Sequence, residues 1–387
     1  MLMKRRADLV VKMRDMVVPS IVEVKRRKEF KRRKFEQRPK YEFSTWGMMR
    51  AHPRFKAPHD RKGGQLFRRR FRVPFPVYVE ILRMTRENDW FTEGRDAIGT
   101  FAAPLELKIL SVLRVLGRGY CFDGVEELCF ISAEVLRQFF HKFCAFFAAK
   151  KAQNFYCAPP TTVEEIKHTT GVYARMGLPG CIGSTDCVHI RWGRCPAGGR
   201  SLHKGKEGYP TLSYEVTVDH SKKIIGVTQG HPGARNDKTI VKFDGYVTSI
   251  HDRKLYQNET FELLDEEGVP RLQTGLYLIM DGGYHKWRRL QSPMKHTSKI
   301  KEALYSKWIE SVRKDVECCF GILKGRFDLS RTALSIPSNA GDKQDAAHAN
   351  LNSWNISRSI FFLHISRSWQ TARPALAMQT YWKLLMS

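Results

Sequence analysis

The chain has 387 residues, 42% of them hydrophobic, and a formal net charge of +27 at pH 7. This length predicts two or three domains, with enough apolar side chains for packed cores. The strong positive charge indicates a polyanionic partner, and the lack of any run of about 18 apolar residues argues against a membrane protein.

Cysteine usage and the first residues bear on the compartment. The nine cysteines form no CxxC pair and show no metal-ligand spacing. An odd number of cysteines without a secretion signal predicts free thiols in a reducing compartment. Residues 1–15 include basic side chains but not the apolar core of a signal peptide. We therefore expect a soluble protein inside the cell.

Residues 1–74 are predicted to form a basic, flexible arm. Residues 1–75 hold 24 Lys and Arg against 7 Asp and Glu, so 24 − 7 = +17 of the net charge lies here. Such a block cannot bury enough apolar surface to fold alone. It is either a solvated tail or a segment for nuclear import or nucleic-acid binding, and the charge density favours the second. The DNA-binding candidates in its densest run are Lys25, Arg26, Arg27, Lys28, Lys31, Arg32, Arg33 and Lys34.

Residues 75–179 have a helical pattern, with apolar side chains recurring every three or four positions. A short helix, a break at Ser132 and a longer helix together predict a helix-turn-helix-like DNA-binding region. An ordinary small helical bundle explains the pattern equally well. A connector with two prolines then leads to a helix capped by Thr161 or Thr162. The first expected helix begins at Phe75, and three further helices are expected at 105–116, 125–129 and 133–149.

Residues 180–330 change to short strands separated by polar loops, and they predict an α/β domain with a mixed sheet. The turn at residues 219–222 joins the second and third strands into a hairpin. Asn236 or Asp237 is suited to cap a following helix. A long amphipathic helix closes the domain at residues 306–325. The four expected strands cover 180–191, 212–218, 223–228 and 276–280.

Three acidic residues stand out in this part of the chain. Asp186 lies in an apolar strand, where a carboxylate must be paired, hydrogen-bonded or bound to a cation. Asp281 ends the fourth strand and is followed by two glycines. If the first and fourth strands are neighbours, the two carboxylates converge, and a shared proton or a divalent cation such as Mg²⁺ would relieve their repulsion. Glu317, at the edge of the long helix's apolar stripe, is the candidate third ligand, although such a residue is more often a surface ion-pair partner.

Four segments in order resemble the motifs of PIF/Harbinger-type DDE transposases, the Harbinger transposase-derived nuclease family. Residues 183–189 (GSTDCVH) resemble the first acidic motif and residues 278–284 (LIMDGGY) the second. Residues 306–327 (SKWIESVRKDVECCFGILKGRF) strongly resemble the last motif, and residues 233–237 (GARND) add to the similarity. The resemblance covers roughly residues 70–330.

This resemblance implies an RNase H-like fold with two Asp on neighbouring strands and a Glu on a later helix. It carries the catalytic and metal-ligand roles onto Asp186, Asp281 and Glu317. His189, Asn236 and Asp237 resemble groups that support the ligands or face DNA, but a hydrogen-bonded strand histidine and a helix cap explain them as well. Arg313 and Lys324, on the same side of the long helix as Glu317, are the candidates for phosphate contacts.

The implied activity is cutting and joining of phosphodiester bonds in double-stranded DNA at transposon terminal repeats, in the nucleus. Two Mg²⁺ or Mn²⁺ ions would serve an in-line phosphoryl transfer. The resemblance also implies a Myb-like DNA-binding partner and is compatible with a homodimer. The alternatives are a domesticated DNA-binding protein that no longer cuts, and a structural protein that binds RNA or chromatin through the arm. Residues 331–387 depart from the family and form a divergent C-terminal segment.

Overall fold

The computed structural model describes residues 40–327, with gaps, and residues 359–361. The gaps are 57–60, 88–101 except 91 and 94, 150–158 except 157, and positions 194, 266, 285–286 and 295. The basic run at residues 25–34 and nearly all of the segment 331–387 lie outside the described residues, so their predicted roles stay predictions. None of the helices in the described part is long and apolar enough to cross a bilayer.

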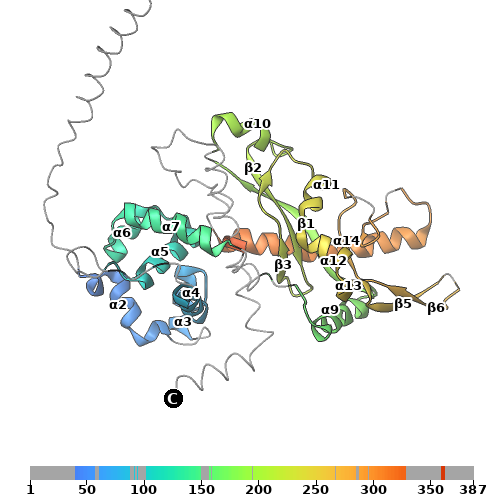
Figure 1. Ribbon diagram of the computed structural model, residues 1–387, viewed down its shortest axis with the longest axis horizontal. Helices are drawn as coiled ribbons and strands as arrows, with labels where there is room; N and C mark the ends of the chain where they lie inside the picture. The colour runs from blue at the N-terminus through green and yellow to red at the C-terminus, as the bar shows by residue number, and fades with distance from the viewer. Residues whose placement is uncertain are drawn as a thin grey trace, which may run out of the picture. The chain divides into compact units, whose positions relative to one another are not determined.

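The first part of the described chain is a group of helices around an aromatic and aliphatic core (Figure 1). The 13-residue helix α4 begins at Phe75, as predicted, with a proline in its first turn. Helices α6 and α7 are separated by the three residues 130–132 and pack into the same core. A DNA-reading role for this pair stays a prediction. The elements are η1 (Tyr41–Phe43), α2 (Thr45–Ala51), η2 (Pro53–Lys56), α3 (Lys62–Phe71), α4 (Phe75–Glu87), α5 (Leu105–Arg118), α6 (Phe122–Cys129) and α7 (Ala133–Phe147).

Residues 41–56 and 61–73, which lie within the predicted arm, fold as part of this helical group. Trp46, Phe67 and Phe71 are buried, with 3% or less of each residue exposed. The ring centroid of Phe71 lies 5.5 Å from that of Trp46 and 4.8 Å from that of Phe67. The high average charge of this stretch hid the spacing of its aromatic residues, which places them on the inner sides of α2 and α3.

The second part is built on a mixed sheet with the strand order β3-β2-β1-β7-β8. The first three strands are antiparallel neighbours, whereas β7 lies parallel to β1 and β8 parallel to β7. The four predicted strands are confirmed, and β4, β8 and the β5–β6 hairpin were missed. The strands are β1 (Cys181–Arg191), β2 (Thr211–Val218), β3 (Ile224–Val227), β4 (His231–Pro232), β5 (Thr260–Leu264), β6 (Pro270–Thr274), β7 (Tyr277–Ile279) and β8 (Leu290–Gln291).

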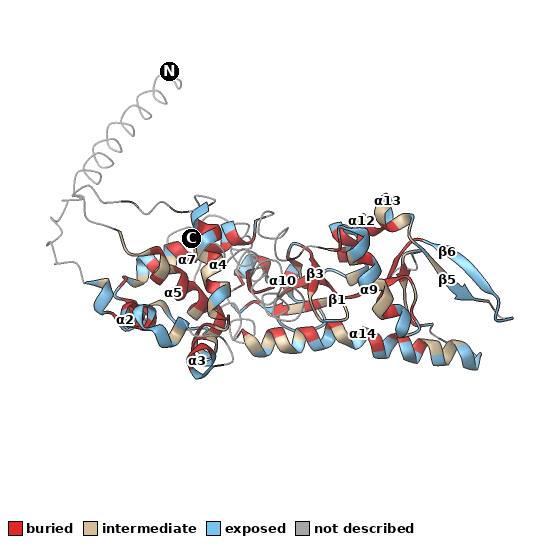
Figure 2. Ribbon diagram, turned by 90° about the horizontal axis from the view of Figure 1, so that it is seen from below, coloured by how far each residue is buried: buried red, intermediate tan, exposed pale blue. Residues whose placement is uncertain are grey.

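Helices cover both faces of this sheet (Figures 1 and 2). The helix α14 is longer than predicted and packs against the face that carries Val188 and Ile190, while α12 packs against the opposite face. This α/β architecture is compatible with an RNase H-like fold. The helices and turns of this part are α9 (Val163–Arg175), η3 (Ala197–Gly199), α10 (Arg200–His203), α11 (Asp237–Ile240), η4 (Val241–Phe243), α12 (Gly245–Asp252), α13 (Lys254–Gln257) and α14 (Ile300–Arg326).

A register shift in β1 sets the faces of its later residues. The pairing of β1 with β7 is irregular between Cys181 and Ser184. Gly183 lies at this point, and a Cβ atom there would come within 2.7 Å of the Val218 carbonyl oxygen. The sequence uses glycine where two backbones approach this closely. From Ser184 onward, the even-numbered residues face α14 and the odd-numbered residues face α11 and α12.

Candidate functional site

Asp186 lies on β1, and Asp281 lies two residues beyond the end of the neighbouring parallel strand β7. The register pairs Ser184 of β1 with Ile279 of β7, and each aspartate follows its paired residue by two positions. Side chains alternate along a strand, so Asp186 belongs to the side of the sheet that faces α14, and Asp281 is close enough for its charge to act on Asp186. The condition set from the sequence, that the first and fourth strands are neighbours, is therefore confirmed.

Arg313 of α14 joins two of the three predicted acids. Its Nη1 donates to Asp186 Oδ2 at 2.9 Å, and its Nη2 donates to Glu317 Oε1 at 2.6 Å. The Arg313 side chain is only 14% exposed. In this structure Arg313, which was predicted to contact phosphate, therefore neutralises the carboxylates. The pairing fixes Glu317 one helical turn from Arg313 on the side of α14 that meets β1.

The pKa of Asp186 depends on its burial and on the charges of the groups around it, which include Asp281 and Glu317. Burial raises the pKa of Asp186 to about 6, while Arg313 and the backbone N–H of Cys187 act to lower it. The charges of Asp281 and Glu317 act in the raising direction, so both are near enough to oppose ionisation of Asp186. In the described part of the chain, the oxygen atoms of these three carboxylates do not all lie within 4.8 Å of one another. The guanidinium of Arg313 lies between two of them.

The turn after β7 positions Asp281. The backbone N–H of Gly283 donates to the Asp281 carboxylate, and a Cβ atom at Gly283 would lie 2.7 Å from Asp281 Oδ1. The next residue, Tyr284, is buried and donates its hydroxyl to Glu215 Oε2 at 2.9 Å. The side chain of Tyr284 thus ties the Asp281 turn to the centre of the sheet.

Glu215 is a fully buried carboxyl group on β2. Its Oε1 accepts a hydrogen bond from Thr185 Oγ1 at 2.8 Å, in addition to the bond from Tyr284. Burial holds the pKa of Glu215 well above its usual range, and the carboxyls of Asp244 and Asp186 act in the same direction. Glu215 was not identified from the sequence, because a single acid in an alternating strand resembles any solvent-facing residue.

Replacing Glu215 by Gln is expected to change the pH dependence of stability. Because the folded-state pKa is raised, the carboxyl contributes favourably below its unfolded pKa and loses that contribution as the pH rises toward the folded pKa. Glu215→Gln should therefore be tolerated and should flatten the loss of unfolding free energy between pH 5 and pH 8. Glu215→Ala should cost about 1–3 kcal/mol, since it leaves the hydroxyls of Thr185 and Tyr284 without this partner. Urea unfolding at both pH values checks this, and an unchanged pH slope in Glu215→Gln would contradict it.

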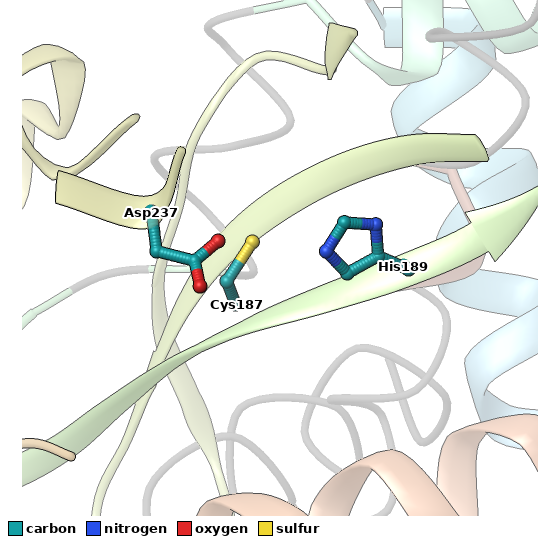
Figure 3. Close-up of side chains that lie close together, drawn as sticks. All are labelled: Cys187, His189 and Asp237. Carbon is teal, nitrogen blue, oxygen red and sulfur yellow. The ribbon is translucent and has the colours of Figure 1, made fainter. Parts of the chain in front are cut away.

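The opposite face of β1 carries a second cluster. Cys187, His189 and Asp237 each offer a ligand atom, and these atoms all lie within 4.8 Å of one another (Figure 3). The three residues could hold a metal ion. Burial and nearby Lys206 lower the pKa of His189, whereas burial and the carboxylates of Glu215 and Asp237 raise that of the Cys187 thiol. The ring is therefore neutral and the thiol protonated near neutral pH.

The other two candidate residues, Asn236 and Lys324, make different interactions. Asn236 caps α11, since its side chain accepts from the Lys238 backbone N–H at 2.9 Å. Lys324 is partly buried near the end of α14, and its charge helps to lower the pKa of His189. The sequence singled out His189 and Asp237 but not Cys187. The spacing of Cys187 and His189 by two residues on a strand was the available signal, because it places both on one face.

Comparisons with known proteins relate this chain to transposons. Residues 154–346, which include all three predicted acids, match the family described as "Plant transposon protein". The chain is similar to "Protein ALP1-like" of Arabidopsis thaliana, at 23% identity over 240 residues. That alignment covers 60% of this chain and 56% of the relative, so the chain spans little more than half the length of this curated relative. No solved structure matches the chain significantly.

Proposed function

We propose that this chain is a metal-dependent DNA endonuclease or transposase of the PIF/Harbinger DDE type. It would act on the phosphodiester bonds of double-stranded DNA at transposon terminal repeats, in the nucleus, and with a Myb-like partner that reads the ends. The observation that carries the proposal is that Arg313 bonds both Asp186 of β1 and Glu317 of α14, while Asp281, just beyond the adjacent strand β7, acts electrostatically on Asp186. The similarity to transposon proteins supports the same reading.

The donor set suits a hard divalent cation. Three carboxylates supply oxygen ligands only, which is the chemistry that Mg²⁺ and Mn²⁺ prefer. Burial and, to a smaller extent, the charges of Asp281 and Glu317 raise the pKa of Asp186, and the guanidinium of Arg313 opposes this rise. Cations bound there would activate the attacking oxygen and stabilise the charge that develops on the leaving oxygen. Asp186, Asp281 and Glu317 are the residues proposed to hold them.

The chain's own contribution is position and charge. Asp186 is anchored by the Cys187 N–H at 2.9 Å and by Arg313, so its carboxylate has a fixed direction. Asp281 is held by the backbone of Gly283. Arg313 is proposed to release Glu317 and Asp186 when the site is loaded and then to meet a DNA phosphate, because its guanidinium binds either kind of anion.

Arg313→Ala is expected to lower the unfolding free energy in metal-free buffer by roughly 1–3 kcal/mol. The reason is that the half-buried Asp186 and the partly exposed Glu317 lose their counter-charge. Excess Mg²⁺ should restore more stability to Arg313→Ala than to the parent chain, since binding to the folded state alone adds stability by mass action. Denaturant titrations with and without Mg²⁺ measure both effects. Equal Mg²⁺ stabilisation of the two chains would contradict a shared site.

A second candidate is a domesticated DNA-binding protein that keeps the fold without cutting. The ion pairs of Arg313 favour it, since they satisfy two of the acids without any cation. Incubation of the full chain with supercoiled plasmid carrying the element's terminal repeats, with Mg²⁺, Mn²⁺ or EDTA, separates the two candidates. Nicked or linear product that requires the cation supports the nuclease, and DNA binding without any product supports the domesticated protein.

A further inference from the structure

We propose that Cys187, His189 and Asp237 form a site for one transition-metal ion of the zinc class. These ligand atoms come from two segments, β1 and the start of α11, and they already lie within 4.8 Å of one another. Cys187 and His189 extend from the sheet face opposite Asp186, so this site is separate from the proposed catalytic acids. The proposal does not depend on the nuclease function.

His189 has the hydrogen bonding of a metal-ligating histidine. Its Nδ1 lies 3.0 Å from Thr211 Oγ1 and 3.1 Å from Ser213 Oγ. Its Nε2 is buried and has no hydrogen-bond partner among the described residues. Figure 3 shows one ring nitrogen directed toward Cys187 and Asp237. Metal-bound histidines use the second ring nitrogen in this way, because a bond on that side fixes the ring and leaves the other nitrogen for the ion.

Asp237 is available for the same purpose because its neighbour caps the helix. Asn236 supplies the side-chain cap of α11 through its bond to the Lys238 N–H. The Asp237 carboxylate instead approaches Cys187 and interacts with its thiol. An ion would replace this contact, and the thiol proton would pass to solvent when the thiolate forms. The ion would thereby tie the beginning of α11 to β1.

The three donors select the class of metal. A thiolate and an imidazole are soft or borderline ligands that suit Zn²⁺, whereas Mg²⁺ takes oxygen ligands. Zinc is commonly four-coordinate, so three protein ligands leave one position for water or another oxygen donor. The same donors would accept Co²⁺, whose bond to a thiolate gives an absorption band that reports the ligand directly.

The test uses the full-length chain freed of metal and then titrated with Zn²⁺ or Co²⁺. We expect a single tightly held Zn²⁺ per chain by elemental analysis, and a thiolate-to-cobalt charge-transfer band on Co²⁺ addition. Cys187→Ser should abolish the band and His189→Ala should lower the bound zinc severalfold. Cys318→Ser, which removes an exposed thiol on α14, is the matched control and should keep both. Asp186→Asn should keep both as well.

A second readout needs no substitution and so does not depend on how a variant folds. Alkylation of the native parent chain, mapped by mass spectrometry, should be slowed at Cys187 by Zn²⁺ and unchanged at the exposed Cys121 and Cys318. Zinc content near zero in the parent, or a charge-transfer band that persists in Cys187→Ser, would overturn the proposal. Equal alkylation of Cys187 with and without Zn²⁺ would show that the cluster is only a thiol–carboxylate contact.

Discussion

Asp186→Asn should lower the metal-dependent rate of DNA cleavage by about 1,000-fold or more. Removing one charged ligand forfeits several kcal/mol of transition-state stabilisation, and each 1.36 kcal/mol corresponds to a factor of ten. The fold should survive, because Asn keeps the shape of Asp186 and removes a half-buried charge that burial already disfavours. Single-turnover cleavage of plasmid DNA under saturating Mg²⁺ measures the effect.

The matched control for this substitution is Asp315→Asn. Asp315 lies on α14 near Glu317 but pairs with Lys222, at 3.0 Å between Nζ and Oδ1. Asp315→Asn should leave the cleavage rate within about threefold of the parent, since a partly exposed ion pair contributes little to stability. A parental cleavage rate in Asp186→Asn, with metal dependence intact, would exclude Asp186 from the reaction.

Phe71→Ala should lower the free energy of unfolding by about 3–5 kcal/mol. Phe71 is fully buried between Trp46 and Phe67, so the substitution leaves a cavity in the helical core. A residue in a flexible arm, as the sequence alone suggested, would show almost no effect. Urea unfolding followed by circular dichroism distinguishes the two expectations.

Phe43→Ala provides the control for this measurement, because Phe43 lies in the same basic stretch but is 62% exposed. Its effect should stay within about 0.5 kcal/mol, as for most surface substitutions. Similar losses of unfolding free energy for Phe43→Ala and Phe71→Ala would mean that α2 and α3 do not pack as described.

The strands of the sheet were largely predictable, because their signals are local. β-branched runs and turn residues marked the strands, and the resemblance of three motifs to those of DDE transposases pointed to Asp186, Asp281 and Glu317 before any strand order was known. From the sequence alone, the pairing of β1 with β7 could only be assumed as the condition under which Asp186 and Asp281 converge. Strand adjacency depends on contacts between distant segments, which periodicity does not encode.

What the sequence missed depended on tertiary contacts. The high average charge of the basic stretch concealed helices α2 and α3, although the buried Trp46 and Phe71 lie in them. The bonds of Arg313 to Asp186 and Glu317 were not predicted, because the position of Asp186 opposite α14 depends on how distant segments pack. The approach of Cys187 to Asp237 joins residues 50 positions apart in the sequence, a distance at which no short metal-ligand spacing exists to be recognised.

Asp186, Asp281 and Glu317 are proposed to bind the cation that serves DNA cleavage. A crystal structure of the full chain soaked in Mn²⁺ tests it most directly, because manganese gives an anomalous signal at its own position. We predict an anomalous peak bounded by the carboxylates of Asp186 and Asp281, with Arg313 moved away from Glu317. Mn²⁺ bound elsewhere in the crystal, with Arg313 still bonded to both Asp186 and Glu317, would contradict the account.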